Sequence, residues 1–291
     1  MAYLALSFEL GALDLNEVEQ LCFRQGALSV TLSDCRDDAV LEPAPGEIRL
    51  WPATRVQALF EGDANADALL PPLCAALQLQ PAQITLSTIE DRVWEREWLR
   101  DFHAMRFGQR LWICPHHETV SAPDAVVVKL DPGLAFGTGT HPSTALCLQW
   151  LDARRCEDTR VIDYGCGSGI LGIAAARLGA REVQSFDLDP QALIATADNA
   201  DRNGVLERLQ IRAEATQIQA GADLLLANIL AGTLIELAAA LAALVRSGGG
   251  IVLAGILEEQ ADAVTAAYAP WFDIAPFGQQ AQWIALAGTR H

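Results

Sequence analysis

Residues 161–169 read Val-Ile-Asp-Tyr-Gly-Cys-Gly-Ser-Gly, and this stretch decides the fold of the chain. A short apolar run ends in Asp163, three glycines then alternate with small residues, and an apolar segment with helical spacing runs to Ala180. The pattern predicts a strand, a tight turn and a buried helix, with glycines that allow close approach of a ligand. Free N–H groups and the positive end of a helix dipole at such a turn favour an anionic or carboxylate ligand.

The spacing of the glycines separates this turn from two common nucleotide-binding loops. A dinucleotide fingerprint reads Gly-x-Gly-x-x-Gly, whereas Ile170 follows Gly169 here. A Walker phosphate loop ends in Gly-Lys-Ser/Thr, and this segment has no lysine. The next predicted strand begins at Glu182 and ends in Asp187, where a carboxylate can accept hydrogen bonds from both hydroxyls of a ribose.

The glycine turn, together with an acid at the end of the second strand, resembles the binding motif of class I S-adenosylmethionine-dependent methyltransferases. The resemblance implies that Asp163 and the three glycines Gly165, Gly167 and Gly169 belong to the cofactor site. It assigns the methionine part of S-adenosylmethionine to the turn and the ribose to Asp187. A glycine-rich turn without a ligand is the alternative, but turn, helix and spaced acid occur together, which favours the cofactor.

Composition limits the partners of the chain. Its 291 residues, 51% of them hydrophobic, suffice for one large domain or two ordinary ones. The formal charge of −17 argues against non-specific DNA or RNA binding, because a phosphate backbone needs a basic face. The same charge suits a basic protein partner through electrostatic steering, although solubility alone also explains it.

Cysteines and hydropathy point to the cytoplasm. The seven cysteines are scattered and form no Cys-x-x-Cys pair, so neither a metal site nor a disulfide framework is indicated. The first residues lack a basic n-region, and no apolar run is long enough to span a membrane. We expect a cytoplasmic monomer without a membrane or DNA partner.

The first 88 residues predict a small α+β domain. Strand and helix signals alternate in the order β-α-β-β-α-β, which is typical of a ferredoxin-like fold. The segments are 3–10, 15–27, 28–33, 54–60, 66–79 and 84–89. The domain holds no constellation of catalytic residues, so it is either a recognition module or a structural appendage.

Residues 89–107 are charged, with apolar residues every three or four positions, and predict a linker helix with a packing face. Residues 108–291 then alternate strands and helices, which predicts a Rossmann-like seven-stranded methyltransferase domain with its ligand at the carboxyl ends of the strands. The expected helices are 145–151, 191–202, 232–246 and 258–268, and the expected later strands are 209–212, 222–228, 251–254, a strand near 272, and 282–287.

A long loop precedes the strand that leads into the glycine turn. Residues 131–144 read Asp-Pro-Gly-Leu-Ala-Phe-Gly-Thr-Gly-Thr-His-Pro-Ser-Thr, and a helix follows. Such a loop is placed to fold over a ligand with its glycines as hinges, and Thr144 falls in the first helical turn. Phe136 and His141 stand among the glycines, which favours a functional loop over an ordinary capped one.

The same loop carries a more specific resemblance. It is similar to that of the bacterial methyltransferases of ribosomal protein L11, the stalk-base protein of the large subunit. The likeness covers nearly the whole chain, including the small N-terminal domain. The other matching motifs are Trp94-Glu-Arg-Glu-Trp98, Asp163-Tyr-Gly-Cys-Gly-Ser-Gly-Ile-Leu, Asp187-Leu-Asp-Pro, Ala227-Asn-Ile-Leu-Ala, Gly255-Ile-Leu and Glu259-Gln.

The resemblance implies trimethylation of lysine ε-amines and of the N-terminal α-amine of ribosomal protein L11, which the N-terminal domain would bind. Its cofactor contacts map onto Thr144, Gly165, Asp187 and Asn228, whereas a serine stands at 143 where the family has a threonine. Asp189 competes with Asp187 for the ribose. We prefer Asp187, because Asp189 precedes a proline and looks like a helix start.

Methyl transfer to an amine needs three things from these residues. A neutral nitrogen must be held opposite the sulfonium sulfur, and Asn228 can accept an amine N–H and orient the lone pair. Phe136 can wall the methyl pocket and tolerate a cationic product. His141 is a candidate base, with a structural role in the loop as the alternative.

Two competing functions remain open from the sequence. Related enzymes that methylate planar amide or base nitrogens carry Asn/Asp-Pro-Pro-aromatic at the position of Asn228, where this chain has Asn-Ile-Leu. A cofactor-binding regulator without turnover is the second alternative. All three glycines, Asp187 and Asn228 are present, which favours an enzyme.

Overall fold

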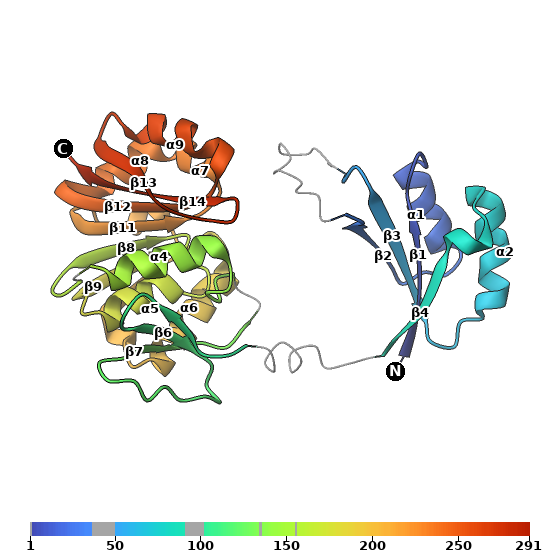
Figure 1. Ribbon diagram of the computed structural model, residues 1–291, viewed down its shortest axis with the longest axis horizontal. Helices are drawn as coiled ribbons and strands as arrows, with labels where there is room; N and C mark the ends of the chain where they lie inside the picture. Colours follow the sequence, from blue (N-terminus) through green and yellow to red (C-terminus); the bar gives the residue numbers. More distant parts are fainter. Residues whose placement is uncertain (1, 37–49, 91–101, 134–135, 155) are drawn as a thin grey trace. The chain divides into compact units, whose positions relative to one another are not determined.

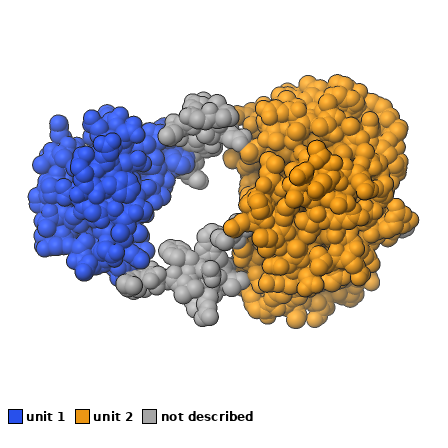
Figure 2. Space-filling model, turned by 180° about the vertical axis from the view of Figure 1, so that it is seen from behind, with its two compact units in different colours: residues 1–93 blue, residues 94–291 orange. Residues whose placement is uncertain are grey.

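The computed structural model describes residues 2–36, 50–90, 102–133, 136–154 and 156–291. The chain divides into two compact units, residues 1–93 and 94–291 (Figure 2). The sequence predicted a first domain of residues 1–88 and a catalytic domain from residue 108. The two units differ from this division only in the segment between those positions.

The first unit is an antiparallel four-stranded sheet with the strand order β2-β3-β1-β4 and two helices (Figure 1). Asp14 starts the first helix by accepting a hydrogen bond from the Glu17 N–H at 3.0 Å. One face of the sheet packs with the helices around buried residues such as Phe8, Val18 and Phe60. The elements are β1 Ala2–Glu9, α1 Leu15–Arg24, β2 Ser29–Asp34, β3 Thr54–Glu61, α2 Ala66–Leu77 and β4 Thr85–Glu90.

The second unit is built on a seven-stranded sheet with the order β10-β9-β8-β11-β12-β14-β13. The strands from β10 to β12 are parallel, and β14 is antiparallel to both of its neighbours. The predicted fold class is confirmed: a seven-stranded methyltransferase-like domain follows a small antiparallel one. The strands are β8 Arg160–Tyr164, β9 Glu182–Phe186, β10 Leu209–Arg212, β11 Ala222–Asn228, β12 Val245–Leu257, β13 Phe272–Gln280 and β14 Trp283–Arg290.

Helices cover both faces of this sheet (Figure 1). Buried residues of α4, α5 and α6 form one apolar cluster, and those of α7, α8 and α9 form a second on the other side. The two clusters leave the carboxyl edge of the parallel strands free to carry a site. The helices are α4 Pro142–Asp152, α5 Ile170–Arg177, α6 Pro190–Arg202, α7 Ala231–Glu236, α8 Ala238–Leu244 and α9 Ala261–Tyr268.

A separate three-stranded sheet precedes α4, with β5 Met105–Phe107, β6 Leu111–Cys114 and β7 Val126–Lys129. The buried carboxylate of Asp152, at the end of α4, accepts hydrogen bonds from the Arg110 N–H at 3.0 Å and the Leu111 N–H at 2.9 Å. Asp152 therefore fixes this sheet to the helix that carries Thr144.

The predicted linker helix is wrong where it can be compared with the structure. Residues 91–101, including most of its aromatic stripe, lie outside the described residues. Residues 105–107 form the strand β5, which pairs antiparallel with β6. Phe107 is buried while Arg106 is exposed, so the end of the segment alternates as a strand does, and pairing with β6 outweighs its helical spacing.

The predicted helix 232–246 is also wrong as one helix. It breaks at Leu237, which has φ −89° and ψ 1°, and gives α7 and α8. Val245 and Arg246 belong to β12, because Val245 is buried and pairs with Ala222 in the sheet. The strand predicted for 251–254 consequently extends over residues 245–257, through the glycines at 248–250.

Candidate active site

A pocket of about 320 Å³ opens where β8, β9 and β11 end side by side. In parallel sheets such carboxyl ends are where ligands bind. Two sequence-predicted glycines, Asp187, Asn228 and Phe136 come together here. The pocket is lined by Phe136, Tyr164, Gly165, Gly167, Phe186, Asp187, Leu188, Asn228, Ile229, Leu230, Thr233 and Leu237.

The glycine turn is held against the end of β9. The N–H groups of Gly165 and Cys166 both donate to the Phe186 carbonyl, at 2.8 and 2.9 Å. Gly167 has φ +54°, and a Cβ atom there would lie 2.5 Å from the Phe136 carbonyl oxygen. Only glycine fits at this position, because a side chain would be strained and would push the covering loop away.

Asp187 faces the pocket with its carboxylate already oriented by the backbone. Its Oδ2 accepts a hydrogen bond from the Gly167 N–H at 2.9 Å, and its Oδ1 accepts one from the Asp189 N–H at 3.0 Å. Asp189 instead caps α6, where its Oδ1 accepts from the Gln191 N–H at 2.9 Å. The geometry favours Asp187 over Asp189 as the group for ribose hydroxyls.

Asp163 and Gly169 are not among the described residues that line this pocket. Asp163 is buried, and its Oδ2 accepts a hydrogen bond from the Gly172 N–H at 2.8 Å. Burial raises the pKa of Asp163 to about 7, and the bond from Gly172 opposes that rise. Gly169 packs against Thr196 of α6. Both residues support the turn in this structure, and their contact with the cofactor stays a prediction.

The long loop is fastened to the glycine turn. The Phe136 carbonyl accepts a hydrogen bond from the Ser168 N–H at 2.9 Å, and the Ser168 hydroxyl donates to the Gly137 carbonyl. These bonds hold Phe136 over the turn, where the residue is 61% exposed and lines the pocket. Gly137 and Gly139 have φ +98° and +90°. Their role as hinges stays a prediction.

His141 serves the start of α4. Its Nδ1 accepts a hydrogen bond from the Ser143 N–H at 3.3 Å and lies 2.7 Å from the Ser143 hydroxyl. In the neutral ring the proton therefore lies on Nε2, and no acceptor nitrogen remains for a substrate amine. Burial also lowers the pKa of His141. The geometry favours the structural role over that of a base.

Asn228 lines the pocket and has a buried acceptor without a partner among the described residues. Its Nδ2 donates a hydrogen bond to the buried Thr144 hydroxyl at 3.1 Å, which fixes the orientation of the amide. Its Oδ1 is buried and has no partner among the described residues. An unsatisfied buried acceptor costs about 1–3 kcal/mol, so a hydrogen-bond donor on a ligand is the natural partner of this oxygen.

Sequence reasoning missed the apolar lining of the pocket. Tyr164 and Phe186 are in ring contact at 4.9 Å, and Leu188 and Leu230 are 87% and 50% exposed at its rim. A signal existed, because Leu188 directly follows the ribose candidate Asp187 and Leu230 lies two positions after Asn228. Large exposed apolar residues at the ends of strands indicate a surface that binds a partly apolar ligand.

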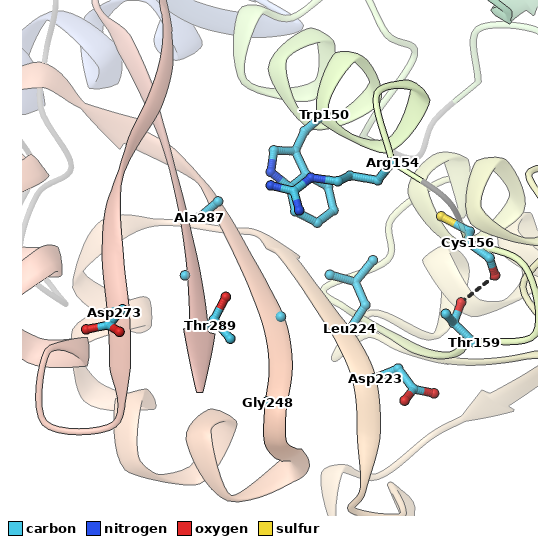
Figure 3. Close-up of a pocket in the computed structure, with 12 residues that line it drawn as sticks. Trp150, Arg154, Cys156, Thr159, Asp223, Leu224, Gly248, Asp273, Ala287 and Thr289 are labelled. Atoms are coloured by element: carbon cyan, nitrogen blue, oxygen red, sulfur yellow. Dashed lines mark hydrogen bonds between the residues drawn. The ribbon is translucent and has the colours of Figure 1, made fainter. Parts of the chain in front are cut away.

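A second pocket, of about 300 Å³, lies at the opposite edge of the sheet, around the first residues of β11 and the last of β14 (Figure 3). Its polar groups mostly have structural partners. Asp223 accepts hydrogen bonds from the Arg160 N–H at 2.8 Å and the Arg246 Nε at 2.6 Å. The Arg154 guanidinium lies over the Trp150 ring, 4.8 Å from its centroid.

Among the described residues, no group of three or more His, Cys, Asp or Glu side chains is placed to hold a metal ion. No helix in the described part of the chain is long and apolar enough to cross a membrane. All seven cysteines are free thiols.

Comparison with known proteins gives one consistent result. Residues 2–291 match the family model described as ribosomal protein L11 methyltransferase. A ribosomal protein L11 methyltransferase from Alkalilimnicola ehrlichii is 48% identical, covering 100% of this chain and 99% of the relative. One from Photorhabdus laumondii is 50% identical, covering 91% and 90%. The crystal structure of a ribosomal protein L11 methylase from Lactobacillus delbrueckii matches with a TM-score of 0.60 and 31% identity, over 65% of this chain and 99% of that one.

Proposed function

The chain belongs to the ribosomal protein L11 methyltransferase family, and from this premise we propose that it transfers methyl groups from S-adenosylmethionine to amines of ribosomal protein L11. The observation that carries the proposal is the pocket at the carboxyl edge, lined by Asp187 just after β9 and by Asn228 at the end of β11. We further propose that the amines are lysine ε-amines and the N-terminal α-amine, each trimethylated. A ribosomal substrate implies that the enzyme acts in the cytoplasm.

The residues of the pocket fit the cofactor. The oriented Asp187 carboxylate suits ribose hydroxyls, and Gly165 and Gly167, which line the pocket with backbone alone, suit the methionine part. The exposed Leu188 and Leu230 suit the apolar faces of the adenine. Bound there, S-adenosylmethionine supplies an electrophilic methyl group on a sulfonium centre.

Asn228 is proposed to orient the amine. A free lysine amine has a pKa of about 10.4, so it must lose a proton to water before its nitrogen can react. The Asn228 Oδ1 can accept one amine N–H, which directs the nitrogen lone pair away from the amide. Because the amide is uncharged, it does not stabilise the unreactive ammonium form as a carboxylate would.

The segment after Asn228 favours an aliphatic amine over a planar nitrogen. Ile229 and Leu230 follow it, where the enzymes that methylate amide or base nitrogens have a Pro-Pro-aromatic platform. The aliphatic side chains offer no flat ring on which an amide or a base would stack. An aliphatic amine needs only a narrow apolar channel and one acceptor, and Asn228 provides the acceptor.

The first unit is proposed as the substrate reader, because the described residues of the catalytic pocket all belong to the second unit. We expect deletion of residues 1–88 to leave cofactor affinity nearly unchanged and to abolish methylation of intact ribosomal protein L11. The measurements are calorimetry with S-adenosylmethionine and mass spectrometry of the substrate after incubation. A truncated enzyme that methylates at the full rate would make the first unit merely structural.

The same mass spectrometry tests the function itself. The full chain should add up to three methyl groups at each modified amine, detected in peptides that contain the N-terminus or a lysine. Substrate whose amines have been acetylated beforehand is the matched control and should gain no mass. Cofactor binding without any mass gain on the native substrate would favour the alternative of a regulator without turnover.

A further inference from the structure

Three aromatic rings form a row that begins at the pocket. Phe136 lines the pocket, its ring centroid lies 5.5 Å from that of His141, and His141 lies 4.6 Å from Trp283. The rings meet at interplanar angles of 61° and 70°. These edge-to-face contacts are the favourable arrangement of aromatic pairs. Trp283 itself does not line the pocket.

The row is anchored in the sheet at the same edge as Asn228. Trp283 begins β14 and pairs with Leu257, whereas Asn228 pairs with Ala254 earlier in β12. The pairing of β12 with β14 shifts register between residues 253 and 256, which lets β14 continue past the level of Asn228. Trp283 is thus carried by a regular strand, whereas Phe136 belongs to a loop.

Of the three residues in the row, only Trp283 belongs to a strand, where it pairs with Leu257 and Gln280. Its ring is half-buried, and it supports His141 at the start of α4. His141 in turn is the ring that contacts Phe136, whose own side chain is 61% exposed. The backbone of Phe136 is held by Ser168, and its ring has His141, backed by Trp283, as its ring contact.

The row is aromatic and neutral. His141 accepts at Nδ1 from the Ser143 N–H, so it is not the doubly protonated cation in this geometry. The faces of neutral rings attract cations, and they do so best when the cation is alkylated and weakly hydrated. An amine that has gained methyl groups fits this description better with each group added.

We propose that Trp283 is a positioning residue that, through His141, holds Phe136 as the wall of the amine channel and so determines how many methyl groups an amine receives. This rests on the proposed function. In each transfer the amine nitrogen forms a bond to the methyl carbon, the carbon–sulfur bond breaks, and the electron pair stays on sulfur as a neutral thioether. The methylated ammonium then loses a proton to water before the next transfer. After the third transfer it has no proton left and keeps its charge.

The test compares Trp283→Leu and Trp283→Phe in the full chain, with a ribosomal protein L11 peptide that carries one free amine. The measurements are the ratio of mono- and dimethyl to trimethyl product at equal total methyl transfer, and cofactor affinity. We expect Trp283→Leu to raise this ratio about two- to fivefold, the range that a cation–π contact provides, with cofactor affinity unchanged. Trp283→Phe keeps a ring and should stay near the wild-type ratio.

Phe136→Leu tests the same wall in case the Trp283 variants fail to fold. Phe136 is largely exposed, so its replacement should not disturb folding, and it should raise the ratio in the same way. An unchanged ratio in both leucine variants would overturn the proposal. An equal fall in cofactor affinity and first transfer in Trp283→Leu, without a change in ratio, would show a merely structural role. A wild-type enzyme that transfers no methyl group would refute the proposed function itself.

Discussion

The two edges of the seven-stranded sheet carry pockets of nearly equal size, about 320 Å³ at the carboxyl edge and about 300 Å³ at the amino edge. At the carboxyl edge, Asn228 keeps a buried acceptor without a partner in the described structure. At the amino edge, the corresponding unpartnered atom is the Trp150 indole Nε1, a donor in a ring that the Arg154 guanidinium covers.

The carboxylates of the two pockets also differ: Asp223 connects strands of the sheet, whereas Asp187 lines its pocket. Asp223 joins three strand segments at the amino edge, through the Arg160 N–H and the Arg246 side chain. Asp187 is held by two N–H groups on the turn and helix start that frame the pocket it lines. Cavity volume therefore does not identify the site. The site is identified by polar groups that face a pocket and are not needed to hold strands together.

The largest effect should come from Asp187→Ala, which removes the carboxylate of the carboxyl-edge pocket. Hydrogen bonds to a charged group contribute about 1.5–3 kcal/mol, so we expect S-adenosylmethionine affinity to fall by that amount in calorimetry. Asp189→Asn is the matched control: it keeps a capping side chain for α6 and should leave affinity unchanged. Unchanged affinity in Asp187→Ala, with a loss in Asp189→Asn, would assign the ribose to Asp189.

The smallest effect should come from the amino edge. Arg154→Ala uncovers the Trp150 ring and removes the one cation that lines that pocket among the described residues. We expect the turnover rate and the cofactor affinity to stay within about twofold of wild type, because such surface pairs contribute about 0.5–1 kcal/mol to stability rather than to chemistry. A tenfold fall in turnover would contradict the conclusion that only the carboxyl-edge pocket takes part in the reaction.

Much of this fold could be predicted from local patterns. Asp189, which looks like a helix start in the sequence, caps α6 in the structure. The break at Leu237 had no such signal, because the surrounding segment is uniformly rich in alanine and leucine. Val245 belongs to a strand because it pairs with Ala222 in the sheet. Local periodicity cannot predict such a contact between residues that are distant in the sequence.

The candidate site shows the same limit. Asp187 and Asn228 could be predicted because both end strands, and the ends of parallel strands meet. Asp163 could not be distinguished from them, since the motif does not say which face of the sheet a side chain takes. In β8, Asp163 lies on the same face as Val161, towards α5, and Gly172 is its partner. The aromatic row could not be predicted either, because Trp283 and His141 are far apart in the chain.

The central claim is that the free Asn228 oxygen marks the chemistry of the site, and Asn228→Ala tests it most directly. Single-turnover methylation and cofactor titration should be measured on one preparation of the variant. A contact made mainly in the transition state lowers turnover with little change in ground-state binding.

We expect turnover of Asn228→Ala to fall at least about tenfold, equivalent to about 1.4 kcal/mol, while cofactor affinity changes much less. Asn228→Asp is the matched variant: it keeps an acceptor, but its charge should hold the amine in the unreactive ammonium form, so turnover should fall as well. If turnover and cofactor affinity instead fall by the same factor in Asn228→Ala, Asn228 binds the cofactor only, and the claim is contradicted.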